Sequence, residues 1–370
     1  MGNIEENYNF PEITSLMHIQ PDKNSGEDRM EKKKIWMYLS FSISAIILAI
    51  IVFSTFNKET LQYLSHLNIS CLILAVVLRI VSFALWAERM RIMSRALGYI
   101  VPFQTCFLAV NANLLIGAIT PSSAGGEAVR IHELYKAGVN IGDATAVVIT
   151  ERFLDAIILV ILAVIGIALM WPSVVGLGDA FVVVIFFSIG MLLLFDLILI
   201  LAVKYPVLVK GRVNRILLAI KKRWDRPSVG KLSIKIDEEF DHFSSGLTAF
   251  AGHARMGLFL GFCYSFLFWF SEFIVASVIL VGLGLPPSIG DSLFAQIIIA
   301  LVSMIPLTPG AAGIAELSAA SLYALFVPTA VLGVFILLWR LIMFYLNIIF
   351  GIIGTMLIVR REVTKKSLKT

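Results

Sequence analysis

Charged residues are scarce in this sequence. Only 15% of the 370 residues are Asp, Glu, Lys or Arg, whereas 59% are hydrophobic, and the mean hydropathy is +0.90. Soluble domains carry about 25% charged residues, so the composition excludes an ordinary soluble protein. Apolar runs longer than about 18 residues recur instead, which is typical of a polytopic helical membrane protein. These runs lack the polar–apolar alternation that the strands of an outer-membrane barrel would show.

Cysteine and histidine are also too few and too dispersed to form a site. The three cysteines, Cys71, Cys106 and Cys263, lie far apart in apolar segments, which fits neither a disulfide framework nor a metal-ligand spacing. The five histidines form no cluster either. We therefore expect no metal site and no cofactor. The net charge of +5 is explained by membrane orientation, so we expect no nucleic-acid partner.

The apolar runs and the charges between them predict a topology. Six full spans are expected, at residues 35–56, 68–87, 143–171, 180–203, 257–283 and 328–359. Loops rich in Lys and Arg alternate with cation-poor loops, and the positive-inside rule places the former in the cytoplasm. Residues 1–34 then form a disordered cytoplasmic tail, 35–359 the membrane domain and 360–370 a second cytoplasmic tail. A multi-pass protein of the cell membrane with both termini inside is predicted.

Two polar segments refine this topology. Arg89, Arg91 and Arg95 follow the second span and are predicted to face the cytoplasm. The loop at 204–256 carries eleven Lys and Arg residues and two amphipathic patterns. The apolar residues of the first pattern are Val209, Val213, Ile216, Ile220 and Trp224, and those of the second are Ile236, Phe240, Phe243, Leu247 and Phe250. The first predicts an interfacial helix on anionic lipid; a plain charged loop is the alternative.

Two shorter apolar runs end in nearly the same sequence. Thr120-Pro121-Ser122-Ser123-Ala124-Gly125 recurs 188 positions later as Thr308-Pro309-Gly310-Ala311-Ala312-Gly313, and a glutamate follows each copy. Pro and Gly break a helix, and lipid tolerates a break only where protein or water satisfies the freed backbone groups. Each run therefore predicts a re-entrant hairpin that turns near the bilayer midplane.

Each hairpin lies between two full spans, once in residues 68–171 and once in 257–358. The first unit enters from outside and the second from the cytoplasm, which is the relation of an inverted repeat. The predicted fold class is an all-α polytopic membrane protein with six full spans and two re-entrant hairpins arranged as an inverted repeat. The halves share little sequence outside the Thr-Pro core, so a coincidental match is the alternative.

The breaks have the chemistry of an anion site. Thr before Pro can start a helix, because Thr caps free N–H groups and Pro suits the first helical position. The glycines would let a backbone or a ligand approach closely. Two helix starts at the midplane would direct positive dipole ends and free N–H groups at one region, which suits a phosphate. A Pro–Gly kink that only eases packing is the alternative.

Charged residues inside the spans extend the candidate site. Arg79 and Glu272 hold similar places in the leading spans and are predicted to pair, and Arg340 also lies deep in a span. Arg152 and Asp155 are spaced to pair on one helix face, either around a cavity or at a helix start by the cytoplasm. The candidate substrate-binding residues are Thr120, Pro121, Gly125, Gly126, Glu127, Arg130, Glu151, Arg152, Asp155, Thr308, Pro309, Gly310, Gly313, Glu316, Arg79 and Glu272.

Three segments resemble the signatures of a known family. They are Pro121-Ser-Ser-Ala-Gly-Gly-Glu127-Ala-Val-Arg130, Glu151-Arg152-Phe-Leu-Asp155 and Pro309-Gly-Ala-Ala-Gly-Ile-Ala-Glu316. They resemble the lysylphosphatidylglycerol synthase/flippase membrane-region family over roughly residues 36–358. That resemblance implies a helical bundle with re-entrant segments that moves a phospholipid or polyprenyl-phosphate-linked headgroup between leaflets. Ala311 and Ala315 depart from the family, which often has Gly and Arg there, and the soluble aminoacyl-transferase domain of full-length synthases is missing.

We therefore predict a lipid flippase-like transporter that moves an anionic phospholipid or polyprenyl-phosphate-linked lipid through a midplane polar cavity, without catalysis of its own. A membrane-embedded transferase acting on a lipid-linked substrate is one alternative, with Glu151 and Asp155 as general bases, although the sequence shows no donor-binding motif. A membrane anchor for a separate synthase or transferase, docked through the basic loop, is another. Membrane lipids are the expected partners.

Overall fold

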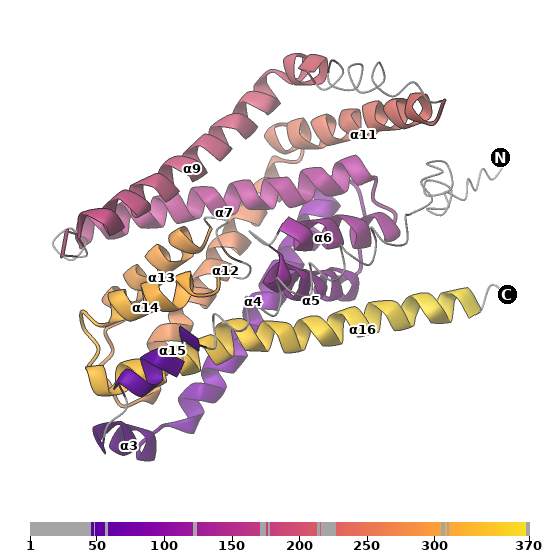
Figure 1. The fold of residues 1–370 in the computed structure, drawn as a ribbon. Coiled ribbons are helices and arrows are strands. Elements are labelled where there is room, and N and C mark those ends of the chain that lie inside the picture. The colour runs from indigo at the N-terminus through magenta and orange to yellow at the C-terminus, as the bar shows by residue number, and fades with distance from the viewer. Residues whose placement is uncertain are drawn as a thin grey trace.

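The computed structural model describes residues 46–47, 49–55, 58–120, 124–170, 175–176, 178–212, 215, 227–304, 308 and 311–367, and within these residues the chain forms helices and no strand (Figure 1). The helices are α3 (Lys58–Ser65), α4 (Ile69–Ala96), α5 (Phe103–Ile119), α6 (Ala124–Lys136), α7 (Ile141–Leu169), α9 (Asp179–Lys204), α11 (Pro227–Ala251), α12 (Arg255–Gly282), α13 (Ile289–Ser303), α14 (Ile314–Tyr323), α15 (Thr329–Arg340), the π-helical turn η1 (Leu341–Tyr345) and α16 (Leu346–Ser367).

Five of the described helical segments are long and apolar enough to cross a membrane. They are α4, α7, most of α9, α12 and the continuous run from α15 through η1 into α16. They correspond to five of the six predicted spans, and the remaining one, at 35–56, lies largely outside the described residues. The all-helical polytopic fold is thus confirmed, and the exact number of spans stays a prediction.

Both Thr-Pro segments interrupt the helices. The helix α5 ends at Ile119, and α6 begins at Ala124 and packs back against α5. In the second half α13 ends at Ser303, and α14 begins at Ile314 and packs against α13. Neither segment therefore continues as one straight helix, as the hairpin prediction requires. The tips include residues 121–123, 305–307 and 309–310, which lie outside the described residues.

The two leading spans, α4 and α12, form the most extensive helix pair of the fold. They run antiparallel, because Gly257 at the start of α12 meets Ala96 at the end of α4, whereas Gly282 at the other end meets Cys71. A Cβ added at Gly257 would lie only 2.2 Å from the Ala96 Cβ, so the small residue permits this approach. The pair brings the polar residues of both helices into the centre of the bundle.

The trailing span of each half packs against the hairpin of the other half. The helix α16, from the second half, packs along α5 of the first hairpin, and α7, from the first half, packs against α13 of the second hairpin. A glycine permits the close approach of the helices at each contact. A Cβ at Gly351 would lie 2.6 Å from the Leu115 Cβ, and one at Gly166 would lie 2.8 Å from the Phe294 ring. Each hairpin is therefore held by a span of the opposite half.

Contacts between the helix ends show which loops lie at the same end of the bundle. At one end Lys136 of α6 pairs with Glu362 of α16, and Tyr99 donates a 2.7 Å hydrogen bond to Asp143. Burial, together with this hydrogen bond, raises the pKa of Tyr99 to about 12. At the other end Thr60 donates to the Ala330 carbonyl over 2.7 Å. This grouping agrees with the predicted sides, and which side faces the cytoplasm stays a prediction.

The basic loop is only partly described. Its second amphipathic pattern is the helix α11, whose Leu247 and Phe250 are buried and which packs on α7 and α12. The Gly142 N–H of α7 donates to Glu239 of α11 over 2.7 Å. The first pattern, with Val213, Ile216, Ile220 and Trp224, lies outside the described residues. The second helix is therefore part of the bundle wall.

Candidate functional site

Six charged side chains of α4, α6 and α7 form a closed ring of alternating sign, here called the six-charge ring. In order around the ring they are Arg89, Glu151, Arg130, Glu127, Arg152 and Asp155, and the last closes on the first. Three positive and three negative charges balance, and every member contacts two members of opposite sign. Such mutual compensation is what allows charges to lie within a membrane-spanning bundle.

Arg89 binds both carboxylates that α7 contributes to the ring. Its Nε lies 3.2 Å from Glu151 Oε1, and its two Nη atoms lie 2.5 and 3.3 Å from the two Asp155 oxygens. Its Nη1 also donates to Ser265 of α12 over 2.6 Å. The guanidinium fork thus satisfies both carboxylates of α7 at once, a geometry that a lysine ammonium does not reproduce.

The placement of Arg89 corrects the predicted end of the second span. Arg89 was expected in a cytoplasmic loop with Arg91 and Arg95, but its side chain is completely buried. The reason is that α4 continues to Ala96, two turns beyond the predicted end of the span, so Arg89 stays within the bundle. The missed signal is periodic: Arg79, Ser82, Trp86 and Arg89 recur at helical spacing on one face.

The ring is walled by aromatic side chains. The Trp86 indole lies under two guanidinium groups, 5.0 Å from Arg130 Cζ and 5.5 Å from Arg152 Cζ. Trp269 donates a 3.1 Å hydrogen bond from Nε1 to Asp155. Cation–π contacts of this kind are worth more where water is excluded. The sequence reasoning missed both tryptophans, because nothing in their spacing separates them from ordinary core residues.

One edge of the ring is partly exposed. The Glu127 and Arg152 side chains are 23% and 28% exposed, whereas Arg130, Glu151 and Asp155 are buried. Arg152 Nε donates to Glu127 Oε1 over 2.6 Å, and Arg130 also pairs with this glutamate. Glu127 lies at the start of α6, next to the first break. Its carboxylate is thus the counter-ion of two arginines.

The position of the ring within α7 excludes the helix-start alternative for its charges. Glu151 lies ten residues into this helix, which begins at Ile141, so it is no helix-start ion pair. The predicted pairing of Arg152 with Asp155 is confirmed at 3.5 Å. Among the described residues, no three His, Cys, Asp or Glu side chains are grouped so that they could hold a metal, since arginines separate the carboxylates of the ring.

The second half has an ion pair in the corresponding place. Glu316, which follows the second break, lies with its Oε1 2.8 Å from Arg340 Nε of α15. The spacing matches, because Glu127 and Arg152 are 25 positions apart and Glu316 and Arg340 are 24 positions apart. Both side chains of the second pair are buried. In each half, therefore, the glutamate after the break binds the arginine of the following span.

A third ion pair joins the halves directly. Arg79 of α4 pairs with Glu272 of α12, which confirms the predicted pairing. Arg79 also donates to the Asn347 side-chain oxygen, over 3.0 Å from Nε and 2.8 Å from Nη2. Both members of the pair are buried. Arg79, Arg130 and Arg152, which were predicted to bind the substrate, thus each have a carboxylate partner in the structure.

The two break tips are stabilised differently. Thr120 was predicted to cap a helix that starts at Pro121, and in the structure it accepts a 3.3 Å hydrogen bond from the Gly125 N–H in the first turn of α6, which begins at Ala124. Thr308 does not follow this prediction, since its hydroxyl donates to the Ala312 carbonyl over 2.9 Å. Glu316 takes over the capping role and accepts from the Gly313 N–H over 2.7 Å. Pro121, Pro309 and Gly310 lie outside the described residues, so convergence of the two tips stays a prediction.

Two backbone positions in the second tip require the left-handed conformation. Gly313 has φ +83° and Ala311 has φ +52°. Glycine adopts this region freely, whereas an L side chain costs about 1–2 kcal/mol there. This conformation explains why glycine is frequent at this position in the family that the sequence resembles, and the alanine of this chain adopts it at that cost.

Gly126 was expected to admit a backbone or a ligand, and in the structure it admits the backbone of α5. A Cβ at this position would lie 2.4 Å from Asn113 Oδ1 and 2.7 Å from the Asn113 carbonyl oxygen. Gly125 is similarly close to Thr120 and Ile116. The glycines of the first break therefore let α6 fold back on α5.

We expect Gly126→Leu to open the first hairpin. The added side chain has to displace the α5 backbone, which should lower the free energy of unfolding by about 3 kcal/mol or more. Thermal unfolding of the purified variant in detergent measures this loss. Gly190→Leu, at a position of α9 with no atom within 4 Å of a Cβ, is the matched control and should remain as stable as the original protein. Equal midpoints for both variants would contradict the close-packed hairpin.

Comparisons with known proteins give one consistent result. The family model described as "Lysylphosphatidylglycerol synthase TM region" matches residues 37–351. A UPF0104 membrane protein of Archaeoglobus fulgidus is 34% identical over 316 residues, covering 84% of this chain and 94% of the relative. A UPF0104 membrane protein of Methanocaldococcus jannaschii is 27% identical over 344 residues, covering 91% and 98%. The residues that the family model matches include both halves and all three groups of charges.

Proposed function

Because this chain belongs to the lysylphosphatidylglycerol synthase transmembrane-region family, we propose that it moves an anionic phospholipid or a polyprenyl-phosphate-linked lipid between leaflets. The Glu127–Arg152 edge of the six-charge ring carries this proposal. It is the partly exposed corner of an otherwise buried and balanced set of charges, and it lies beside a helix break in the membrane domain. Intramembrane charges in such a position typically mark a substrate pathway.

A lipid phosphate can substitute for Glu127 in this ring. Arg130 and Arg152 offer guanidinium groups, which bind phosphate and carboxylate in the same bidentate way. Since the ring stays neutral only with an anion at this corner, a headgroup that binds there releases Glu127, and with it the start of α6. The carboxylate then expels the phosphate when it returns. The hairpin α5–α6 would move with each exchange.

The relation between the halves supports transport by alternating access. Each hairpin is held by a span of the opposite half, each post-break glutamate binds the next span's arginine, and Arg79 meets Glu272 between the leading spans. These correspondences support an inverted repeat, the architecture of many secondary transporters. We assign the helix ends around α11 to the cytoplasm, following the positive charge of the loops.

The arrangement of Glu151 and Asp155 favours transport over a transferase reaction. A general base has to reach the proton that it removes. Both carboxylates are buried, and each is already bound by two arginines of the ring. They therefore serve the protein as counter-ions that position α4, α6 and α7.

Leaflet exchange in reconstituted vesicles tests the proposal. We expect the purified protein to carry fluorescent phosphatidylglycerol to the outer leaflet, where an impermeant reductant quenches it. Glu127→Gln removes the competing carboxylate, so the phosphate is retained and the rate should fall roughly tenfold, as expected for the loss of one charge-assisted contact. The rate is normalised to folded protein measured by size-exclusion chromatography.

Glu88→Gln is the matched control. The Glu88 side chain is 21% exposed and pairs with Arg91, so it resembles Glu127 in exposure and partner type but lies outside the ring. Its exchange rate should stay within about twofold of the original, because exposed ion pairs contribute little. Absence of exchange with phosphatidylglycerol and with a polyprenyl phosphate would refute the function. Equal rates for both glutamine variants would refute the role of Glu127.

A further inference from the structure

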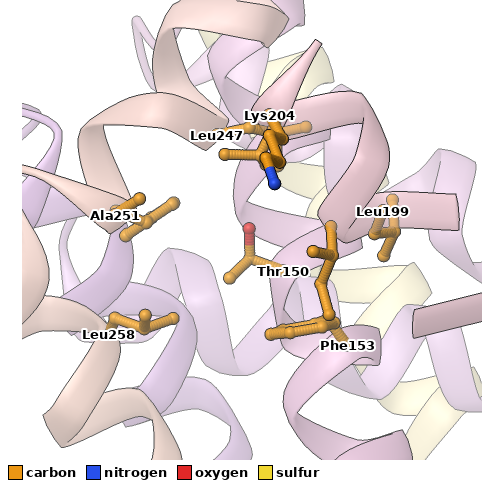
Figure 2. Close-up of a pocket in the computed structure, with 10 residues that line it drawn as sticks. Thr150, Phe153, Leu199, Lys204, Leu247, Ala251 and Leu258 are labelled. Atoms are coloured by element: carbon orange, nitrogen blue, oxygen red, sulfur yellow. The ribbon is translucent and has the colours of Figure 1, made fainter. Parts of the chain in front are cut away.

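A cavity lies between α7, α9, α11 and α12 (Figure 2). Its volume is about 300 Å³, at the lower end of the roughly 300–1,000 Å³ of small-ligand sites. The walls are almost entirely apolar. They include Phe153 of α7, Leu199 and Val203 of α9, Phe250 of α11 and Leu258 of α12. A space of this size suits one acyl chain.

Two polar groups interrupt these apolar walls. Figure 2 shows the Thr150 hydroxyl and the Lys204 ammonium both directed into the space between the helices. Thr150 is only 5% exposed, and its hydroxyl has no hydrogen-bond partner among the described residues. A buried hydroxyl without a partner costs free energy that a bound acceptor would recover. The cavity therefore combines an unsatisfied donor, a cation and an apolar wall.

We propose that this cavity binds an anionic phospholipid of the leaflet on the α11 side, with one acyl chain between α7, α9 and α11 and the phosphate beside Lys204. The role as an entry site rests on the proposed transport function, whereas the binding itself does not. The charge of Lys204 complements a phosphate, and Thr150 Oγ1 donates to its oxygens or to the ester oxygens next to it.

The surroundings of the cavity favour a membrane lipid over a soluble ligand. The neighbouring face of α9 exposes Leu197, Ile198 and Leu201, which in a spanning helix face the hydrocarbon. Lys204 is the last residue of α9, where a lysine extends its ammonium to the headgroup region. An acyl chain can thus pass from the bilayer past α9 into the cavity while its headgroup stays at the interface.

The cavity also lies next to the six-charge ring along the chain. Thr150 and Phe153, which line the cavity, flank Glu151 and Arg152, which belong to the ring. A lipid held here would place its phosphate on the same helix as the exposed edge of the ring. The cavity and the ring thus share the helix α7, and the proposed role as an entry site rests on this shared helix.

Native mass spectrometry of the full-length protein in detergent tests the binding. The probes are dioleoyl phosphatidylglycerol and, as the neutral counterpart, dioleoyl phosphatidylcholine. We expect phosphatidylglycerol to bind preferentially and inorganic phosphate not to compete, because the acyl chain supplies part of the affinity. Leu199→Trp fills the cavity and should weaken binding of both lipids roughly tenfold. Lys204→Gln should remove the preference for phosphatidylglycerol, a change of roughly tenfold for one charge-assisted contact.

Each variant has a control outside the cavity. Leu197→Trp makes the same substitution on the lipid-exposed side of α9, and Arg360→Gln removes an exposed charge from α16. Neither should change lipid binding by more than about twofold. The assignment is overturned if Leu197→Trp weakens binding as much as Leu199→Trp, if Lys204→Gln keeps the preference, or if inorganic phosphate displaces the lipid. Leaflet exchange without this binding would overturn the entry site and leave the proposed function intact.

Discussion

Arg89→Ala should prevent accumulation of folded protein. Removing this guanidinium leaves Glu151 and Asp155 in the bundle with only Arg130 and Arg152 for compensation, and it also takes a partner from Ser265. Breaking one buried ion pair typically costs about 3–5 kcal/mol, and this substitution breaks two. A domain with about 5–15 kcal/mol of total stability should lose most of its folded population. Fluorescence-detected size-exclusion chromatography of the expressed variant measures that population.

Two further substitutions separate the specific role of Arg89 from a general effect of charge. Arg89→Lys should give an intermediate yield, because one ammonium cannot bind both carboxylates in the fork geometry. Arg91→Ala, two positions along α4, removes a half-exposed arginine whose partner is Glu88, and its yield should match the original protein. A normal yield of Arg89→Ala would show that the six-charge ring does not hold α4 to α7.

The spans and the breaks were predictable because they depend on local chemistry. Runs of apolar residues define α7, α9 and α12 within a few residues, and Pro and Gly end α5 at the predicted position. The pairing of Arg79 with Glu272 was predictable as well, since each is an expensive charge at a similar depth of a leading span. In these cases the kind of residue and its place along the chain were enough for the prediction, without any knowledge of tertiary contacts.

The ring was not predictable as a whole, because it depends on how three helices cross. The sequence places Arg89 next to Arg91 and Arg95, and composition alone assigns all three to a loop. The tertiary contact of α4 with α12 keeps Arg89 inside, where Ser265 of α12 accepts a hydrogen bond from it. Likewise, Gly126 was ambiguous between ligand and backbone approach until α5 was in place.

The balance of the ring also changes what its arginines are expected to do. Arg130 and Arg152 were predicted from the sequence to bind the substrate, and in the structure Glu127 is already paired with both of them. In the proposed mechanism a phosphate binds only in competition with this carboxylate, so that binding and motion of the hairpin are one event. A site of this kind exchanges counter-ions, whereas an open arginine site would simply retain an anion.

The pair of Arg79 and Glu272 should show strong coupling in a double-mutant cycle. Arg79→Leu alone leaves a buried carboxylate, Glu272→Leu alone leaves a buried guanidinium, and each should cost about 3–5 kcal/mol. The double variant has no uncompensated charge, so its stability should return close to that of the original protein. Thermal unfolding in detergent, followed for all four proteins, gives the coupling free energy.

The surface pair of Glu88 and Arg91 supplies the matched cycle, with both residues replaced by leucine. Its coupling should be below about 1 kcal/mol, because water solvates either charge when the other is removed. If the Arg79–Glu272 double variant is no more stable than the single ones, the two charges do not compensate each other. If it is stable but inactive in leaflet exchange, the pair acts between the halves during transport, because the packing of α4 on α12 no longer needs it.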